Sequence, residues 1–137
     1  MLFVVRETGM PLLQQFLLVD LGGGIGAAMR FGTGLWAARV LGTEFPWGTF
    51  IVNVVGSFLI ACVVEFAVMR GEAGNWMRFL LVTGFLGGFT TFSAFSLDTM
   101  ALVERGETGL VLLYVGASVL LSVAACWGGL IFARSVL

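Results

Sequence analysis

Four long apolar runs, separated by short charged turns, limit what this chain can fold into. The hydrocarbon core of a bilayer is about 30 Å thick, and a helix needs about 20 apolar residues to cross it. Each run is long enough for one crossing, and 137 residues leave room for little else. The sequence therefore predicts an all-α membrane protein, a single four-helix transmembrane domain over residues 1–137 with both termini on one side. The predicted spans are about 12–40, 47–69, 75–103 and 108–132.

Charge and composition exclude several classes of protein. The chain has 11% charged residues, a net charge of −1 and no histidine. It therefore lacks a basic surface for nucleic acid, and it cannot build histidine metal sites or histidine proton relays. It also lacks a glycine-rich loop of the kind that holds nucleotide phosphates. We predict no enzymatic activity, no nucleic-acid partner and no nucleotide, with the lipid bilayer as the solvent.

The third run contains a sequence that is poor for a continuous helix. Residues 83–93 read TGFLGGFTTFS, with paired glycines and paired threonines. This pattern predicts a helix broken at mid-membrane, where freed carbonyls must face protein, water or an ion because lipid cannot bond them. Discontinuous helices of transport proteins hold cations with such carbonyls. A kink that serves packing alone is the other interpretation.

Two phenylalanines follow the predicted break. Phe92 and Phe95 lie three residues apart, hence on one face of the second half-helix, beside the hydroxyls of Thr91 and Ser93. The edge of a phenyl ring is electropositive, so ring edges can line an anion path without a fixed charge that would trap the ion. Ordinary aromatic packing is the alternative.

Two polar stripes run along the second and fourth predicted helices. Amide and hydroxyl donors on such a stripe can replace part of the hydration shell of an anion. Hydrogen bonds between helices, or back to a residue's own helix, are the alternatives. The first stripe is Thr49, Asn53 and Ser57, and the second is Tyr114, Ser118 and Ser122 at i, i+4 and i+8.

Four helices are too few to enclose a polar path and still face lipid, so we expect an oligomer, at minimum a dimer. The arginine bias that orients membrane proteins is weak here, with four arginines on the terminal side against Arg39 and Arg105 on the other. We therefore expect insertion in both orientations and an antiparallel pair. Arg30 lies inside the first span, where charge is costly, and is a candidate for an electropositive vestibule.

Three segments resemble the Fluc (CrcB-like) fluoride channels. They are residues 22–31 (GGGIGAAMRF), 47–58 (WGTFIVNVVGSF) and 83–95 (TGFLGGFTTFSAF), and the likeness spans nearly the whole chain from about residue 12. The resemblance implies a dual-topology homodimer in the cytoplasmic (inner) membrane. It also implies passive export of fluoride, which reduces fluoride toxicity. Donors and ring edges suit any small anion, so the choice of fluoride depends on this resemblance.

Carried over residue by residue, the resemblance assigns roles to individual positions. It implies a structural sodium ion on the twofold axis of the dimer, held by the carbonyls of Gly87 and Thr90. The sequence departs from the family at Asp98, where many relatives would have glutamate, and at Asp20. The implied fluoride pathway consists of Asn53, Phe92, Phe95, Tyr114, Ser118, Ser122, Thr91, Ser93 and Arg30.

Two other classes of protein remain as alternatives. A small dual-topology, proton-coupled multidrug exporter would use Asp20 as its shared acidic site, but it gives no reason for the break, and Asp20 lies near the helix start. A structural membrane subunit would use the polar stripes only to bind helices together. Residues 1–9 precede the first predicted helix and are expected to be poorly ordered.

Overall fold

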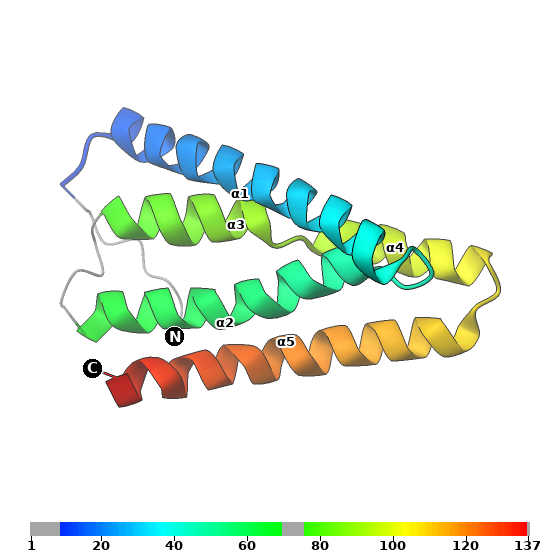
Figure 1. Ribbon diagram of the computed structural model, residues 1–137. Coiled ribbons are helices and arrows are strands. Elements are labelled where there is room, and N and C mark those ends of the chain that lie inside the picture. Colours follow the sequence, from blue (N-terminus) through cyan, green and yellow to red (C-terminus); the bar gives the residue numbers. More distant parts are fainter. Residues whose placement is uncertain (1–8, 70–75, 137) are drawn as a thin grey trace.

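The computed structural model describes residues 9–69 and 76–136, which form helices joined by short turns (Figure 1). Apart from Gly9, the prediction of poor order for residues 1–9 lies outside the described residues. In chain order the elements are α1 (Leu12–Leu41), α2 (Trp47–Met69), the π-helix η1 (Arg78–Leu86), α3 (Gly87–Phe89), α4 (Phe92–Glu104) and α5 (Thr108–Val136).

Within the described ranges, four helical stretches are long and apolar enough to cross a membrane, which confirms the predicted all-α class and helix count. Large apolar side chains point outward on several of them, such as Leu13 with 71% of its surface exposed and Leu112 with 72%. A helix that is apolar on its outer face is suited to lipid rather than water. The four stretches are Leu12–Leu41, Trp47–Met69, Arg78–Glu104 and Thr108–Val136.

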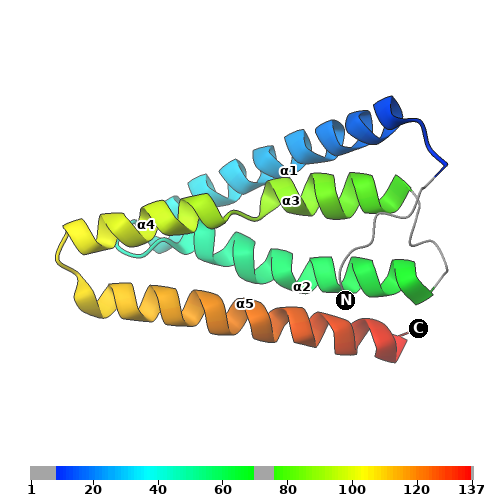
Figure 2. The same cartoon turned by 180° about the vertical axis from the view of Figure 1, so that it is seen from behind.

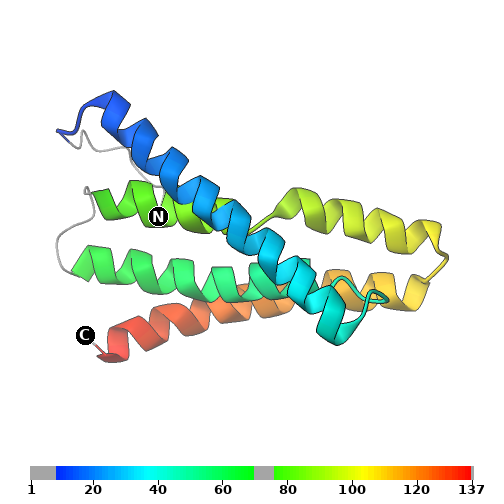
Figure 3. The same cartoon turned by 45° about the horizontal axis from the view of Figure 1, so that its top comes forward.

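The helices form an elongated bundle in which α2 lies beside α5, and α1 lies beside η1 and α3 (Figures 1 and 2). The start of α1 and the end of α5 lie at one end of the bundle (Figure 1). The α1–α2 loop and the α4–α5 turn lie toward the other end, where α1 crosses the bundle obliquely (Figure 3). Gly42 and Gly106 permit these two turns, because each has a positive φ, of 84° and 72°.

Backbone packs directly on backbone between α1 and η1. A Cβ atom added to Gly22 would collide with the carbonyl oxygen of Leu80, and one added to Gly26 would collide with that of Phe85. A Cβ on Gly88 would lie 2.5 Å from a carbonyl oxygen of α1. Small residues four apart allow this approach, and in lipid such van der Waals contact is a main source of helix association.

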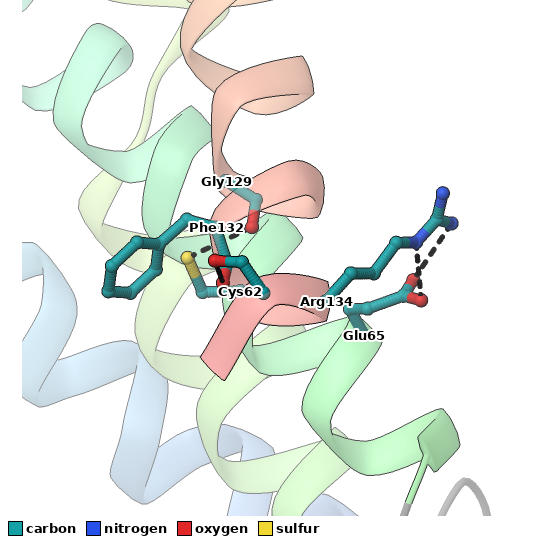
Figure 4. Close-up of polar contacts among 6 residues, drawn as sticks. Cys62, Glu65, Gly129, Phe132 and Arg134 are labelled. Carbon is teal, nitrogen blue, oxygen red and sulfur yellow. Dashed lines mark hydrogen bonds and ion pairs between the residues drawn. The ribbon is translucent and has the colours of Figure 1, made fainter. Parts of the chain in front are cut away.

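The α2–α5 interface also depends on a glycine, Gly129. It has polar contacts near the end of the bundle where α1 starts and α5 ends (Figure 4). The Sγ atom of Cys62 donates to the carbonyl oxygen of Gly129 over 3.5 Å. One turn further along α2, Glu65 Oε1 accepts from Arg134 Nε at 2.8 Å. This packing brings the polar stripes of α2 and α5 to the same side of the broken helix.

Candidate ion pathway

Helical backbone stops at two threonines between α3 and α4. Thr90 has φ −80° and ψ 157°, and Thr91 has φ −156° and ψ 120°, both extended conformations. The Thr91 hydroxyl caps α4 by accepting the N–H of Ala94 at 3.1 Å, and the Thr90 hydroxyl donates to the carbonyl of Leu86 at 2.9 Å. A threonine N-cap of this kind stabilises a helix start that has lost its preceding turn.

Asn53 on α2 binds both backbone polar groups of Thr91. Its Oδ1 atom accepts the Thr91 N–H at 2.8 Å, and its Nδ2 atom donates to the Thr91 carbonyl at 3.0 Å. The amide therefore replaces the helical partners that the interruption removes, as an apolar environment requires. An amide nitrogen carries two hydrogens, so the second one remains for another acceptor. From the sequence, a hydrogen bond between helices and a donor to an anion were alternative roles for Asn53. This geometry is compatible with both roles.

The contacts of Thr91 leave two carbonyls without their helical donors. In an α-helix the Gly87 carbonyl would accept the Thr91 N–H, which here is directed at Asn53. The Thr90 carbonyl would accept the Ala94 N–H, which here is directed at the Thr91 hydroxyl. Gly87 is exposed on the surface of the chain and Thr90 is half-buried. These two oxygens fit a hard cation, which prefers oxygen ligands and is held by unwound backbone in transport proteins.

A cavity of about 380 Å³ lies beside the interruption, between α2, α4 and α5. Its wall is mostly apolar, and it is open to the surface of the chain on one side. Six of the residues predicted for the pathway line it, namely Asn53, Thr91, Phe92, Phe95, Ser118 and Ser122, and Thr90 lines it as well. Helical spacing had placed these residues on three separate stripes, and the fold brings the stripes together.

Ser118 supplies an unused donor to this cavity. Its residue is 6% exposed, and its Oγ atom is buried without a hydrogen-bond partner within the described part of the chain. The hydroxyl of Ser57, on the opposite wall, instead donates to the Asn53 carbonyl at 2.6 Å. A buried polar group without a partner costs free energy and calls for an explanation such as a ligand.

The aromatic residues form a line from the cavity into the bundle. The ring centroids of Phe92 and Phe95 are 5.4 Å apart, and those of Phe95 and Tyr114 are 5.3 Å apart. Phe92 is 78% exposed in the single chain, whereas Tyr114 is fully buried. The Tyr114 hydroxyl donates to Asp98 Oδ2 at 3.2 Å, so this tyrosine lies behind the cavity wall and not on it.

Three other candidates are not among the residues that line this cavity. Ser93 is exposed, with its hydroxyl 3.1 Å from that of Thr91. Arg30 is half-buried on α1 and is not among the residues that line the cavity. Asp20, which the exporter hypothesis requires, is exposed on α1 and is likewise outside it.

A second cavity of about 290 Å³ lies under the α1–α2 loop and the α4–α5 turn. Thr49 and Asp98 line it, and so do Glu44 and Arg105, which form an ion pair of 2.7 Å between Oε2 and Nη2. In the sequence, Asp98 was noted only as a departure from the family, at a position where many relatives would have glutamate. Its contact with Tyr114 joins residues 16 apart in different helices, which no local pattern encodes.

A protein with four apolar spans, an interrupted helix and, beside the interruption, a mostly apolar cavity that carries a few polar side chains belongs to the class of membrane channels and transporters. The comparison with protein families is more specific. The family described as "CrcB-like protein, Camphor Resistance (CrcB)" matches residues 17–130 of this sequence. The chain therefore belongs to the CrcB-like family.

Relatives in three bacteria carry one name. The fluoride-specific ion channel FluC of Rhizobium etli is 52% identical over 122 residues, which cover 89% of this chain and 98% of the relative. That of Agrobacterium fabrum is 51% identical, with 87% and 95% covered. That of a Chelativorans species is 52% identical, with 91% and 100% covered. The likeness thus extends over nearly the full length of these proteins.

Proposed function

We propose that this chain forms a fluoride channel that lets fluoride leave the cell passively and so reduces its toxicity. The observation that carries the proposal is the cavity between α2, α4 and α5. Two phenyl rings line it, and so does the buried hydroxyl of Ser118, which has no protein partner in the described chain. The name shared by the relatives supplies the identity of the ion.

The side chains of the cavity suit an ion that must bind and then leave. The Ser118 hydroxyl and the second amide hydrogen of Asn53 would replace part of the hydration shell, and the ring edges of Phe92 and Phe95 would supply weak positive potential. None of the residues that line this cavity is charged. An anion would therefore be desolvated only partly and would meet no arginine that could hold it tightly.

The membrane potential gives the direction of transport. A cell interior that is negative by 100 mV favours the exit of a monovalent anion by about 2.3 kcal/mol. This corresponds to a concentration ratio of roughly 50 at equilibrium. Placed in the cytoplasmic membrane, a passive pathway is thus sufficient to keep internal fluoride low, and no coupling to ATP or protons is needed.

A second copy of the chain would complete the pathway. Phe92 is 78% exposed and the cavity is open on one side, which is unsuitable for an ion path in direct contact with lipid. A homodimer in antiparallel orientation would cover this opening. The weak arginine bias supports insertion in both orientations.

The two freed carbonyls support a structural cation at the centre of this dimer. In a twofold arrangement, Gly87 and Thr90 of each copy would present four carbonyl oxygens to one sodium ion. The ion would offset the cost of unpaired carbonyls at the depth of the interruption. Its role would be to join the two copies, and no step of permeation is assigned to it.

Fluoride efflux from liposomes tests the proposal. Purified protein in vesicles loaded with potassium fluoride should release fluoride when valinomycin carries the counter-current, without any proton gradient, and should release little chloride under the same conditions. A folded dimer that releases no fluoride would contradict the proposal. Efflux that requires a proton gradient and is lost in Asp20→Asn would instead support the exporter class.

A further inference from the structure

The second cavity, under the α1–α2 loop and the α4–α5 turn, has no role in the function described so far. We infer that this cavity is a mouth of the anion pathway and that the Glu44–Arg105 ion pair controls the anion concentration there. By neutralising Glu44, Arg105 would keep the mouth from repelling fluoride. This inference rests on the proposed channel function.

A short series of side-chain contacts connects the two cavities. Phe95 lines the first cavity, and its ring packs on that of Tyr114 with centroids 5.3 Å apart. The Tyr114 hydroxyl donates over 3.2 Å to Asp98, which lines the second cavity. A path from Ser118 past these rings would therefore open into the second cavity.

Three ionisable side chains line the second cavity, and only one of them is a cation. Arg105 Nη2 lies 2.7 Å from Glu44 Oε2 and 3.9 Å from Glu107 Oε1, while Asp98 is bonded to the Tyr114 hydroxyl. Arg105 Nη1 also donates to the backbone carbonyl of Glu44 at 3.4 Å. Without Arg105, the carboxylates of Glu44 and Asp98 would face the cavity with no lining cation.

The exposure of this pair argues against a large contribution to stability. The side chain of Glu44 is 85% exposed and that of Arg105 is 40% exposed. Exposed ion pairs contribute little to stability, with a median of about 0–1 kcal/mol. Fixed charges at the rim of a cleft nevertheless change the local concentration of an entering ion, and salt screens this effect.

Charge variants in the liposome assay test the inference. At an ionic strength of about 10 mM, where the Debye length is roughly 30 Å, we expect Arg105→Gln to lower the initial fluoride efflux about threefold. Glu44→Gln should raise it by a similar factor, and Arg105→Lys, which keeps the charge, should stay close to the wild type. At about 1 M salt, where the Debye length is roughly 3 Å, these differences should largely disappear.

The ion pair Glu65–Arg134 provides a matched control. It also pairs an exposed arginine with a glutamate, here between α5 and α2 at 2.8 Å, but it lies near the opposite end of the bundle and lines neither cavity. Glu65→Gln and Arg134→Gln should leave the efflux rate unchanged.

The outcomes separate the two claims. Wild-type protein without fluoride efflux would refute the channel function itself. If the wild type releases fluoride but Arg105→Gln and Arg134→Gln have the same efflux rate, the inference about the second cavity is refuted and the channel function is not. Effects of the charge variants that persist at high salt would refute this inference as well. Glu44→Gln keeps the test valid if Arg105→Gln folds poorly, because misfolding cannot raise the efflux rate.

Discussion

At the scale of single residues, the interruption of the third helix depends on Asn53. Replacement by alanine would leave the N–H and carbonyl of Thr91 without the bonds of 2.8 and 3.0 Å that they now make. An unsatisfied buried group costs about 1–3 kcal/mol. We therefore expect Asn53→Ala to lower the free energy of unfolding by about 2 kcal/mol or more and to reduce fluoride efflux. Unfolding of the purified protein with increasing SDS measures the first effect.

Thr33→Ala is the control for that loss of stability. Thr33 is half-buried, and in the described part of the chain its hydroxyl donates to the Met29 carbonyl, in its own helix, through an exposed hydrogen bond. Its removal should change stability by less than about 0.5 kcal/mol. Equal unfolding curves for Asn53→Ala and Thr33→Ala would show that the Asn53 contacts are not needed.

Replacement of Ser118 should reduce fluoride efflux without a loss of stability. Its hydroxyl has no hydrogen-bond partner in the described chain, so Ser118→Ala removes no protein contact and should leave stability within about 0.5 kcal/mol of the wild type. Hydrogen bonds to charged groups contribute about 1.5–3 kcal/mol, so fluoride efflux should fall about tenfold. The control is Ser96→Ala, an exposed hydroxyl bonded to the Phe92 carbonyl. If Ser118→Ala releases fluoride at the wild-type rate, Ser118 does not belong to the pathway.

The sequence predicted which residues lie close together more accurately than it predicted their hydrogen-bond partners. Helical spacing alone groups Phe92 with Phe95 and Ser118 with Ser122, and all four line one cavity. The Asn53–Thr91 contacts join residues 38 positions apart. Such contacts depend on how helices pack, and a single sequence contains no periodic signal for them.

At the scale of helices, the α1–η1 interface should tolerate no added methyl group at its contact points. Gly26→Ala would drive a Cβ atom into the Phe85 carbonyl, and backbone moves less readily than a side chain. We expect a loss of about 1–3 kcal/mol in unfolding free energy, the range for overpacked interiors. Gly24→Ala is the control on the same helix, since its added methyl group would have no atom within 4 Å. If both variants unfold alike, close packing at Gly26 does not stabilise the fold.

The π-helical form of η1 was not predicted. The sequence indicated an ordinary helix up to the paired glycines, whereas Arg78–Leu86 is wider, and the Gly87 N–H bonds back five residues to the Val82 carbonyl. A π-helix is rare because its local backbone geometry is less favourable. Here its carbonyls face the glycines of α1, so the form accompanies tertiary packing that residue propensities do not encode.

At the scale of the whole molecule, the arginine distribution predicts mixed orientation. All seven basic residues are arginines, and they are spread over both ends of the predicted spans. Reporter fusions to the C-terminus, one active only inside and one only outside the cell, should therefore both give signal. Adding three lysines to the C-terminus should favour one orientation and reduce efflux. A single orientation for the unmodified chain would contradict the antiparallel pair.

The double hydrogen bond between Asn53 and Thr91 also has a mechanical consequence. A single hydrogen bond would allow Thr91 to rotate relative to Asn53, whereas two bonds to the same residue fix its orientation as well as its position. The middle of α2 and the first turn of α4 must then move together as a rigid body, and Phe92 and Phe95 move with them. Helices tilt to match the thickness of the surrounding bilayer. The spacing of the phenyl rings is thereby tied to the lipid that surrounds the protein, so conductance should vary with acyl-chain length.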